Sequence, residues 1–397
     1  MQHLRQLFLN HIAQTSDAPL MLEIERASGI YLYGKNEKKY IDLISGISVS
    51  NIGHCHPEVV KAVQQQAEKF MHLMVYGEYI HYPQVAYAKL LIEQLPEKLN
   101  SVYFVNSGAE ATEGAMKLAK RVTNRAEIIY CKNSYHGSTQ GALSVMGDEY
   151  FKNAFRPLLP NTKMIRYGVA EDLENISNKT AAIIIEAVQA ESGVTVPENN
   201  YLDKVRAQCD KHGALMILDE IQTGFGRTGK LFAFQHTHSI PDILLLAKGM
   251  GGGMPIGAFI SATENMNQLT HNPVLGHITT FGGHPVTCAA GKATLEVLLA
   301  TKMYESVAEK EKMFLEKLQH KFIKKVNSKG LLMALEFDSY ETNKKIIDCC
   351  IEAGLITDWF LFAPHCMRIA PPLIITEPEI HEACNVILQA IDKVCGK

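Results

Sequence analysis

Residues 214–219 read Ala-Leu-Met-Ile-Leu-Asp, a run of five apolar residues that ends in an acid. An apolar run without polar alternation is typical of a parallel strand that helices cover on both faces. Similar short runs recur along the middle of the chain, and helical patterns such as residues 109–122 lie between them. Further strands are expected at residues 102–105, 127–130, 181–185, 243–246 and 258–260. The middle of the chain is therefore predicted to be α/β, with a mostly parallel central sheet.

The two ends of the chain have a different texture. From about Thr287 the sequence favours Lys- and Glu-rich helices at residues 288–299 and 303–326, strands at 331–337 and 367–369, and a closing helix at 377–394. The first residues contain a strand-like run at 30–33 that fits neither part alone. We expect a large domain of residues 56–286 and a small α+β domain that combines residues 1–55 with residues 287–397.

Composition excludes several classes of protein. The 397 residues include 39 Lys and Arg against 42 Asp and Glu, a net charge of −3, which lacks the basic excess of a nucleic-acid reader. No apolar run approaches the roughly 20 residues that span a membrane. Nine scattered cysteines without a paired motif indicate reduced thiols. The sequence predicts a cytoplasmic protein that binds neither nucleic acid nor membrane.

Three ionisable residues stand at the ends of three predicted strands: Glu186, Asp219 and Lys248. Ligands of open α/β sheets bind at this edge. Asp219 could instead cap the next helix, and a lysine at a loop mouth is often only solvated. However, Lys248 ends an apolar run and precedes the glycine-rich residues 249–255, which suits a Schiff-base nucleophile. Three such groups at three strand ends favour an active site.

The stretch from Gly224 to Leu231 is a misleading motif. It satisfies both GxGxxG and the GxxxxGK core of a phosphate loop. A phosphate loop needs Ser or Thr after its lysine and follows directly on a strand. Here Leu231 takes that position and residues 219–222 intervene, so nucleotide binding is disfavoured.

Other short motifs are weaker. Residues 106–110, Asn-Ser-Gly-Ala-Glu, lie between a strand and a helix start and could hold a phosphate or merely cap the helix. Residues 135–139 offer an aromatic ring before a glycine, and residues 279–283 offer two hydroxyls before glycines. The histidine pairs at 54–56 and 236–238 have spacings unsuited to a metal, and none is expected.

Taken together, these segments resemble the fold-type I, class III aminotransferases that use pyridoxal 5′-phosphate (PLP), the group of the acetylornithine, ornithine and 4-aminobutyrate enzymes. The resemblance runs almost end to end, from residues 34–57 to Arg368-Ile369-Ala370-Pro371-Pro372-Leu373. Residues 218–229, Leu-Asp-Glu-Ile-Gln-Thr-Gly-Phe-Gly-Arg-Thr-Gly, match the family nearly verbatim. The glycine-rich stretch thus belongs to the neighbourhood of the PLP site.

The resemblance implies a role for each matching residue. Lys248 would form the Schiff base with PLP and then shuttle a proton, Asp219 would keep the pyridine nitrogen protonated, and Gln222 would bond the ring hydroxyl. The remaining cofactor contacts would come from Tyr135 on the ring face with His136 beside it, Glu186 near the ring, and Ser107, Gly108 and Ala109 at the phosphate. Thr280 would reach the phosphate of a neighbouring subunit, which implies a homodimer and leaves a tetramer open.

The substrate would be bound by Arg368 and Glu191. The matching arginine of the family binds the α-carboxylate of glutamate or 2-oxoglutarate, and the matching glutamate masks it when an ω-amino substrate arrives. One departure limits the analogy, because Ser138 stands where the family's arginine grips the distal carboxylate of the substrate. Acetylornithine should then be a poor donor unless another cation replaces that arginine.

The resemblance therefore implies a PLP-dependent aminotransferase. It would move an amino group from an ω-amino or acetylornithine-like donor to 2-oxoglutarate by a ping-pong mechanism. A PLP-dependent aminomutase or racemase is the first alternative, and a non-catalytic binding protein of the same fold is the second.

Overall fold

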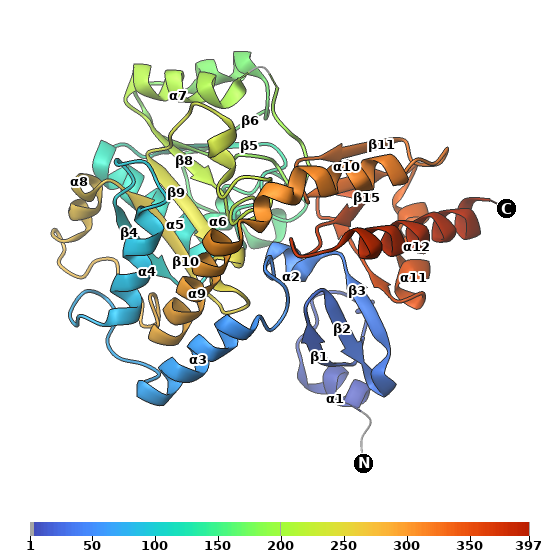
Figure 1. The fold of residues 1–397 in the computed structure, drawn as a ribbon. Helices are drawn as coiled ribbons and strands as arrows, with labels where there is room; N and C mark the ends of the chain where they lie inside the picture. Colours follow the sequence, from blue (N-terminus) through green and yellow to red (C-terminus); the bar gives the residue numbers. More distant parts are fainter. Residues whose placement is uncertain (1–3, 199, 397) are drawn as a thin grey trace.

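The computed structural model, which describes residues 4–198 and 200–396, contains a central seven-stranded sheet (Figure 1). Its order is β4-β10-β9-β8-β7-β5-β6. The four pairs from β9 to β6 are parallel, and only β10 runs antiparallel to its neighbours. This confirms the prediction of a mostly parallel α/β sheet. The strands are β4 (Ser101–Val105), β5 (Glu127–Cys131), β6 (Thr162–Ile165), β7 (Thr180–Glu186), β8 (Leu215–Asp219), β9 (Ile243–Ala247) and β10 (Gly257–Ser261).

Both faces of this sheet are covered, which explains its apolar strands. Helix α5 (Gly108–Thr123) packs on one face, where Ala115 and Leu118 join Ile184 of β7 in one cluster. The residues on either side of Ile184 point the other way and pack toward the second layer. That layer contains α4 (Tyr82–Ile92), α7 (Tyr201–His212) and α9 (Pro285–Thr301). A strand buried on both sides has no polar face, as the sequence pattern indicated.

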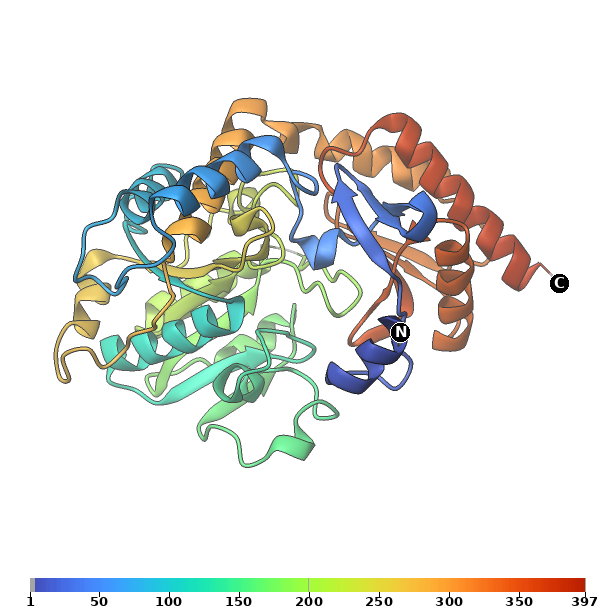
Figure 2. The ribbon, with the colours of Figure 1, turned by 90° about the horizontal axis from the view of Figure 1, so that it is seen from below.

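Two four-stranded sheets form the other half of the molecule. In one, β1 (Ile24–Ser28), β2 (Tyr31–Gly34) and β3 (Lys39–Asp42) are followed by β13 (Leu355–Ile356), parallel to β3. In the other, the order is β11 (Lys325–Ser328), β12 (Met333–Glu336), β15 (Ala363–Ile369) and β14 (Trp359–Phe360). Figure 2 shows the N-terminal strands lying against the C-terminal part. The first strands of the chain thus share a sheet with one of its last.

The helices of this half are α10 (Val307–Lys317), α11 (Tyr340–Glu352) and α12 (Glu377–Cys395). Helix α9, in contrast, packs on α4 and on α3 (Pro57–Lys69), beside the central sheet. The domain boundaries expected from the sequence stay a prediction.

One sequence prediction is wrong. Residues 303–326 were expected to form a single long helix, but α10 ends at Lys317 and β11 begins at Lys325. Pairing of β11 with β12 outweighs the helical propensity of this Lys-rich stretch. The remaining elements are short: α1 (Leu4–His11), α2 (Ser45–Ser48), α6 (Gln140–Ser144), α8 (Thr263–Met266), and 3-10 turns at Lys35–Glu37, Asn153–Phe155, Ala170–Asn175, Ala233–His236, Lys248–Gly251, Asn267–Leu269 and Met303–Ser306.

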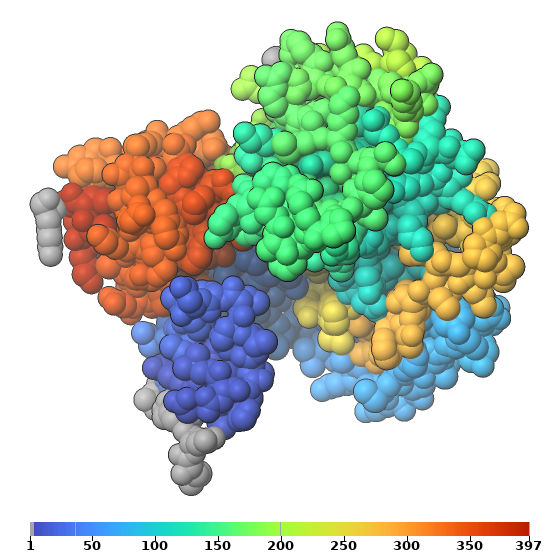
Figure 3. All heavy atoms as spheres, turned by 180° about the vertical axis from the view of Figure 1, so that it is seen from behind, coloured from blue at the N-terminus to red at the C-terminus, as the bar shows by residue number. Residues whose placement is uncertain are grey.

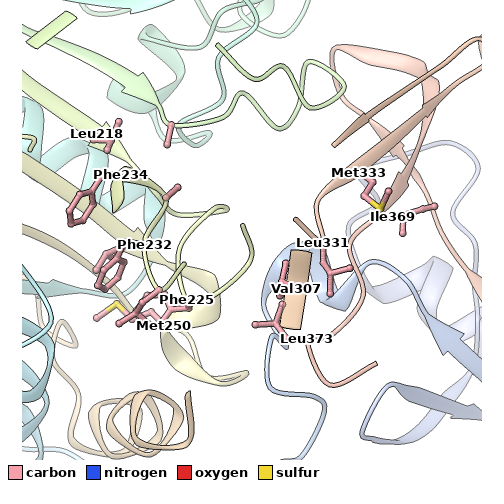
Figure 4. Packing of buried hydrophobic residues seen from close by; sticks show 14 of the residues in the cluster. Leu218, Phe225, Phe232, Phe234, Met250, Val307, Leu331, Met333, Ile369 and Leu373 are labelled. Carbon is pink, nitrogen blue, oxygen red and sulfur yellow. The ribbon is translucent and has the colours of Figure 1, made fainter. Parts of the chain in front are cut away.

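A shared apolar cluster joins the two halves. Figure 4 shows Phe225 and Phe232 on one side of it and Val307 and Leu373 on the other. Seen from behind, the surface is hollowed between the blue N-terminal segment and the neighbouring parts of the chain (Figure 3). Along the residues that the structure describes, no helix combines the length and the apolar character that a membrane crossing requires.

The glycine-rich loop at 224–231 lies at this junction. A Cβ on Gly226, whose φ is +92°, would come within 2.7 Å of Leu373 and 2.9 Å of Tyr304. Only glycine fits so close an approach. The loop therefore packs against the other half of the molecule, and the glycine at 226 is explained without a nucleotide.

Candidate active site

The ends of β7, β8 and β9 bring Glu186, Asp219 and Lys248 to one edge of the central sheet. Glu186 and Asp219 are direct partners in the register of β7 and β8, and Lys248 follows the last residue of β9. All three line a cavity of about 410 Å³. The cavity also contains seven other residues expected from the sequence, namely Ser107, Gly108, Ala109, Tyr135, His136, Ser138 and Gln222.

Lys248 has the surroundings of a reactive amine. Burial lowers its pKa, and the positive charge of Arg368 adds to this effect, while Glu191, Asp219 and Glu186 oppose it. A lower pKa makes the neutral, nucleophilic amine more accessible. Its φ of +49° is unusual for a residue with a side chain, and such strain gathers at functional sites.

Asp219 is held by two contacts. Its Oδ1 accepts a hydrogen bond from the backbone N–H of Ile221 at 2.9 Å, and its Oδ2 lies 2.7 Å from Nδ1 of His136. Both side chains are almost fully buried. The sequence placed His136 beside the cofactor but gave no sign of this pair, because the two residues are 83 positions apart.

Glu186 differs from its neighbour Asp219. Burial, followed by the repulsion of the Asp219 carboxylate, raises the pKa of Glu186 well above its ordinary value. Its Oε2 accepts a long hydrogen bond of 3.4 Å from the backbone N–H of Tyr135. The raised pKa favours the neutral acid form of Glu186 in this cavity.

The start of α5 closes another side of the cavity. Ser107 caps the helix, since its Oγ accepts from the N–H of Glu110 at 3.2 Å. A Cβ on Gly108 would lie 2.8 Å from Cδ1 of Ile221, so the helix start and the strand-end loop approach closely. The cavity is thereby lined by a helix N-terminus, which favours anions such as phosphate.

Arg368 and Glu191 form a buried ion pair next to the cavity. Nη1 and Nη2 of Arg368 each lie 3.0 Å from one carboxylate oxygen of Glu191. Gln222 joins them, because its Nε2 donates to Glu191 at 3.1 Å and its Oε1 accepts from Arg368 at 3.3 Å. Burial alone would raise the pKa of Glu191, but the charges of Arg368 and Lys248 outweigh it and hold this pKa at about 2. The arginine is therefore masked by an ionised carboxylate.

Two expected residues lie at the rim or outside. Ser138 is exposed, and its Oγ lies 3.2 Å from the Oη of Tyr135. Thr280 is exposed in the loop before α9 and does not line this cavity. The contact of Thr280 with the cofactor of a neighbouring subunit stays a prediction.

The sequence did not predict a second set of contacts to Arg368, which comes from Asp358 and the two residues of β14. Asp358 Oδ1 accepts from Nε of Arg368 at 2.8 Å, and the Trp359 carbonyl accepts from Nη2 at 3.1 Å. The ring of Phe360 covers the guanidinium at 4.3 Å. Nothing in the local pattern signals these contacts, because they depend on the pairing of β14 with β15.

The residues around the cavity fit PLP. A reactive lysine, a buried carboxylate backed by a histidine, and a helix N-terminus match the aldehyde, the ring nitrogen and the phosphate of that cofactor. In addition, Nε2 of His136 is buried without a hydrogen-bond partner among the described residues, which indicates room for a further polar group. The fold and the site together define a PLP-dependent transferase.

Comparison with known proteins identifies the family. Residues 12–391 match the family model of the class-III aminotransferases, and the chain belongs to that family. It is 37% identical over 366 residues to the acetylornithine aminotransferase of Methanopyrus kandleri, covering 91% of this chain and 92% of that one. It is 38% identical to the enzyme of the same name from Methanocaldococcus jannaschii, covering 94% of each.

Solved structures agree with this assignment. The fold is similar to that of the ornithine aminotransferase of Toxoplasma gondii, with a TM-score of 0.91 and 30% identity over 98% of this chain and 93% of that one. That structure is described with partial occupancy of PLP at its active site. The chain is accordingly a PLP-dependent transaminase.

Proposed function

We propose that this aminotransferase moves an amino group from an ω-amino donor to 2-oxoglutarate in two successive half-reactions. The observation that carries the proposal is the Arg368–Glu191 pair beside Lys248. When Glu191 moves away, the guanidinium of Arg368 would bind the α-carboxylate of the 2-oxo acid. When Glu191 stays paired with Arg368, the same region would accept the uncharged methylene chain of the donor. One cavity could then serve both substrates.

The site residues divide the remaining tasks. When bound, PLP supplies an electron sink for the carbanion that forms at the substrate carbon. Lys248 is proposed to hold the cofactor and to carry the proton between donor and cofactor carbons, since its pKa is lowered. Asp219, fixed by His136, would balance a positive charge on the ring nitrogen. Gln222, Tyr135 and the start of α5 would orient the ring and the phosphate.

The donor is proposed to lack a distal carboxylate. The relatives named above are acetylornithine aminotransferases. In the family that this sequence resembles, an arginine is expected at position 138, but this chain has Ser138 there. A hydroxyl cannot offer the bidentate charged contact of a guanidinium. Among the residues that the structure describes, the cavity that Ser138 lines contains no arginine, and its one lysine is Lys248.

A donor screen tests this proposal. Purified holoenzyme is assayed with acetylornithine, ornithine, lysine, 4-aminobutyrate and diamines, each against 2-oxoglutarate. We expect the diamines to exceed acetylornithine in kcat/KM by at least about tenfold, the usual effect of one lost charged contact. The variant Ser138→Arg should narrow this ratio. A clear preference of the unaltered enzyme for acetylornithine would refute the argument from Ser138.

We further propose that the active unit is a homodimer. Exposed apolar side chains gather on two adjoining segments, with Ile80 and Tyr82 on one and Val274 and Phe281 on the other. The first segment also contains His72, whose ring lies 4.9 Å from the ring of Phe281 in the second, so the two segments are in contact. Thr280 is exposed beside Phe281 in the second segment, and we propose that it reaches the cofactor of the partner subunit. Large apolar patches of this kind are typical of interfaces.

Light scattering of the purified enzyme tests the dimer. The wild type should have twice the mass of the 44.1 kDa chain, and Ile80→Asp should shift it toward the monomer. A monomeric wild type with full activity would contradict the proposal. The nine cysteines, all unpaired in the structure, support a reducing compartment, and we propose the cytoplasm.

A further inference from the structure

The guanidinium of Arg368 has every one of its N–H groups in a hydrogen bond. Two of them meet the carboxylate of Glu191, and one meets the amide oxygen of Gln222. The last two donate to Asp358 and to the carbonyl of Trp359. A guanidinium has five N–H donors, so the set is complete. When Glu191 moves away for a substrate carboxylate, only two of the five bonds are released.

The other contacts come largely from one short segment, residues 357–360. Besides accepting from Nε of Arg368, Asp358 accepts the backbone N–H of the same residue through its carbonyl, at 2.8 Å. Thr357 Oγ1 donates to the Arg368 carbonyl at 2.6 Å. Phe360, fully buried, covers the flat face of the guanidinium. The segment thus holds both the backbone and the side chain of Arg368.

The two carboxylates on Arg368 are placed differently. Glu191 takes the end of the guanidinium formed by Nη1 and Nη2, the edge that a substrate carboxylate would use. Asp358 takes the Nε, beside the stem of the side chain. Glu191 can therefore exchange with substrate, while Asp358 can stay bound through the whole reaction.

We propose that Asp358 is a positioning residue that keeps the guanidinium of Arg368 aimed at the cavity whenever Glu191 gives way to a substrate carboxylate. The inference rests on the proposed function, because it assumes that Arg368 binds the 2-oxo acid. The inference goes beyond the proposed function because it assigns Arg368 a permanent carboxylate partner, Asp358, besides Glu191, which exchanges with substrate. Without Asp358, the guanidinium would adopt several orientations once Glu191 leaves. The substrate carboxylate would then bind more weakly, because binding would have to order the Arg368 side chain.

The electrostatic setting agrees with this role. Burial raises the pKa of Asp358 to about 6, with the charge of Arg368 opposing that rise. At neutral pH the carboxylate is therefore ionised. One fixed negative charge then compensates the buried Arg368 cation during the exchange, when Glu191 has left and the substrate has not yet bound.

The two half-reactions provide the test. Holoenzymes with Asp358→Ala and Asp358→Asn are mixed with a diamine in one experiment and, in the amine form, with 2-oxoglutarate in the other. We expect the apparent KM for 2-oxoglutarate to rise about tenfold to a hundredfold in the alanine variant, in line with loss of a charge-assisted bond. The asparagine variant, which keeps an acceptor, should show a smaller rise. The diamine half-reaction should stay within about twofold, because Arg368 is masked there. Asp338→Asn, an exposed aspartate in the same half of the molecule, is the matched control.

A binding measurement provides a second readout. Trp359 is the only tryptophan of the chain, so its fluorescence reports on this segment alone. Glutarate carries two carboxylates but neither an oxo nor an amino group and cannot react. We expect it to give a saturable fluorescence change in wild-type holoenzyme, a Kd about tenfold or more higher in Asp358→Ala, and a smaller increase of the Kd in Asp358→Asn.

The outcomes separate the inference from the proposed function. If Arg368→Lys impairs the 2-oxo acid half-reaction and the Asp358 variants do not, the inference is overturned and the function stands. Equal losses in both half-reactions would also overturn it, since they would indicate a merely structural aspartate. If the wild type transfers no amino group to any 2-oxo acid, the proposed function itself fails.

Discussion

Glu191 and Arg368 are 177 positions apart in the sequence, yet their side chains share two hydrogen bonds of 3.0 Å. The family resemblance named both residues and their roles, and their contact in the structure is what those roles require. It did not name Asp358, Trp359 or Phe360, because a segment that only supports an arginine carries no motif. Motifs thus point to groups expected to touch a ligand, and they leave out groups that act through another side chain.

The Glu191 carboxylate should make stability depend on acid pH. Its pKa is about 2 in the folded chain and roughly 4.3 when unfolded, so the folded state favours the ionised form. The resulting stabilisation, up to roughly 3 kcal/mol, is present above the unfolded pKa and is lost as the pH falls through the folded one. Urea unfolding of wild type and Glu191→Gln should show a difference that is constant near neutral pH and shrinks below about pH 4.5. A difference independent of pH down to the acid limit of folding would contradict this account.

At the scale of elements, the central sheet was predictable, but the end of the helix that the sequence suggested for residues 303–326 was not. The strands are apolar on both faces because helices cover both, and such a pattern is visible in one sequence. Whether residues 318–328 extend a helix or form a strand depends on whether β12 offers an edge. That edge is built by residues elsewhere, so no local pattern could reveal it.

Two glycines of α5 should have separate roles. A Cβ on Gly108 would press on Cδ1 of Ile221, a flexible end that can move toward the cavity. A Cβ on Gly114 would lie 2.3 Å from the ring of Phe259, which is stacked on Tyr103 and cannot yield. We expect Gly108→Ala to weaken PLP affinity about tenfold with little loss of stability. Gly114→Ala should instead destabilise the fold by about 1–3 kcal/mol, the usual cost of overpacking.

Equilibrium dialysis of PLP and urea unfolding of the cofactor-free chain distinguish these two effects. Each variant serves as the control for the other, since both add one methyl group to the same helix. If both variants lost stability equally and bound PLP equally well, the start of α5 would have no special relation to the cofactor.

At the scale of the whole molecule, Arg227 joins the two halves. It is completely buried, and its guanidinium donates to the carbonyls of Leu331 and Pro371 and to the side chain of Asn51. Burial lowers its pKa to about 9. The sequence showed this arginine only inside a misleading phosphate-loop motif, because its partners lie more than a hundred positions away.

Removal of Arg227 should therefore weaken the whole fold. In Arg227→Ala, three buried oxygen atoms lose a donor, and we expect a loss of about 3 kcal/mol or more in the free energy of unfolding. Arg166→Ala, which removes an exposed arginine paired with Asp172, should cost less than about 1 kcal/mol. Denaturant unfolding measures both, and similar costs for the two variants would show that Arg227 is not an essential junction.

The central claim is that one cavity, with Lys248 and the Arg368–Glu191 pair, carries out two amino-transfer half-reactions through PLP. The most direct measurement follows the visible absorbance of the holoenzyme while a diamine and then 2-oxoglutarate are added. We predict that the diamine alone converts the cofactor to its amine form in a single turnover, and that 2-oxoglutarate restores the starting spectrum and yields glutamate. Lys248→Ala should show neither the starting absorbance nor turnover, while the exposed Lys230→Ala should behave as wild type. Continued conversion of the donor without any 2-oxo acid, or a spectrum that no donor changes, would contradict the account.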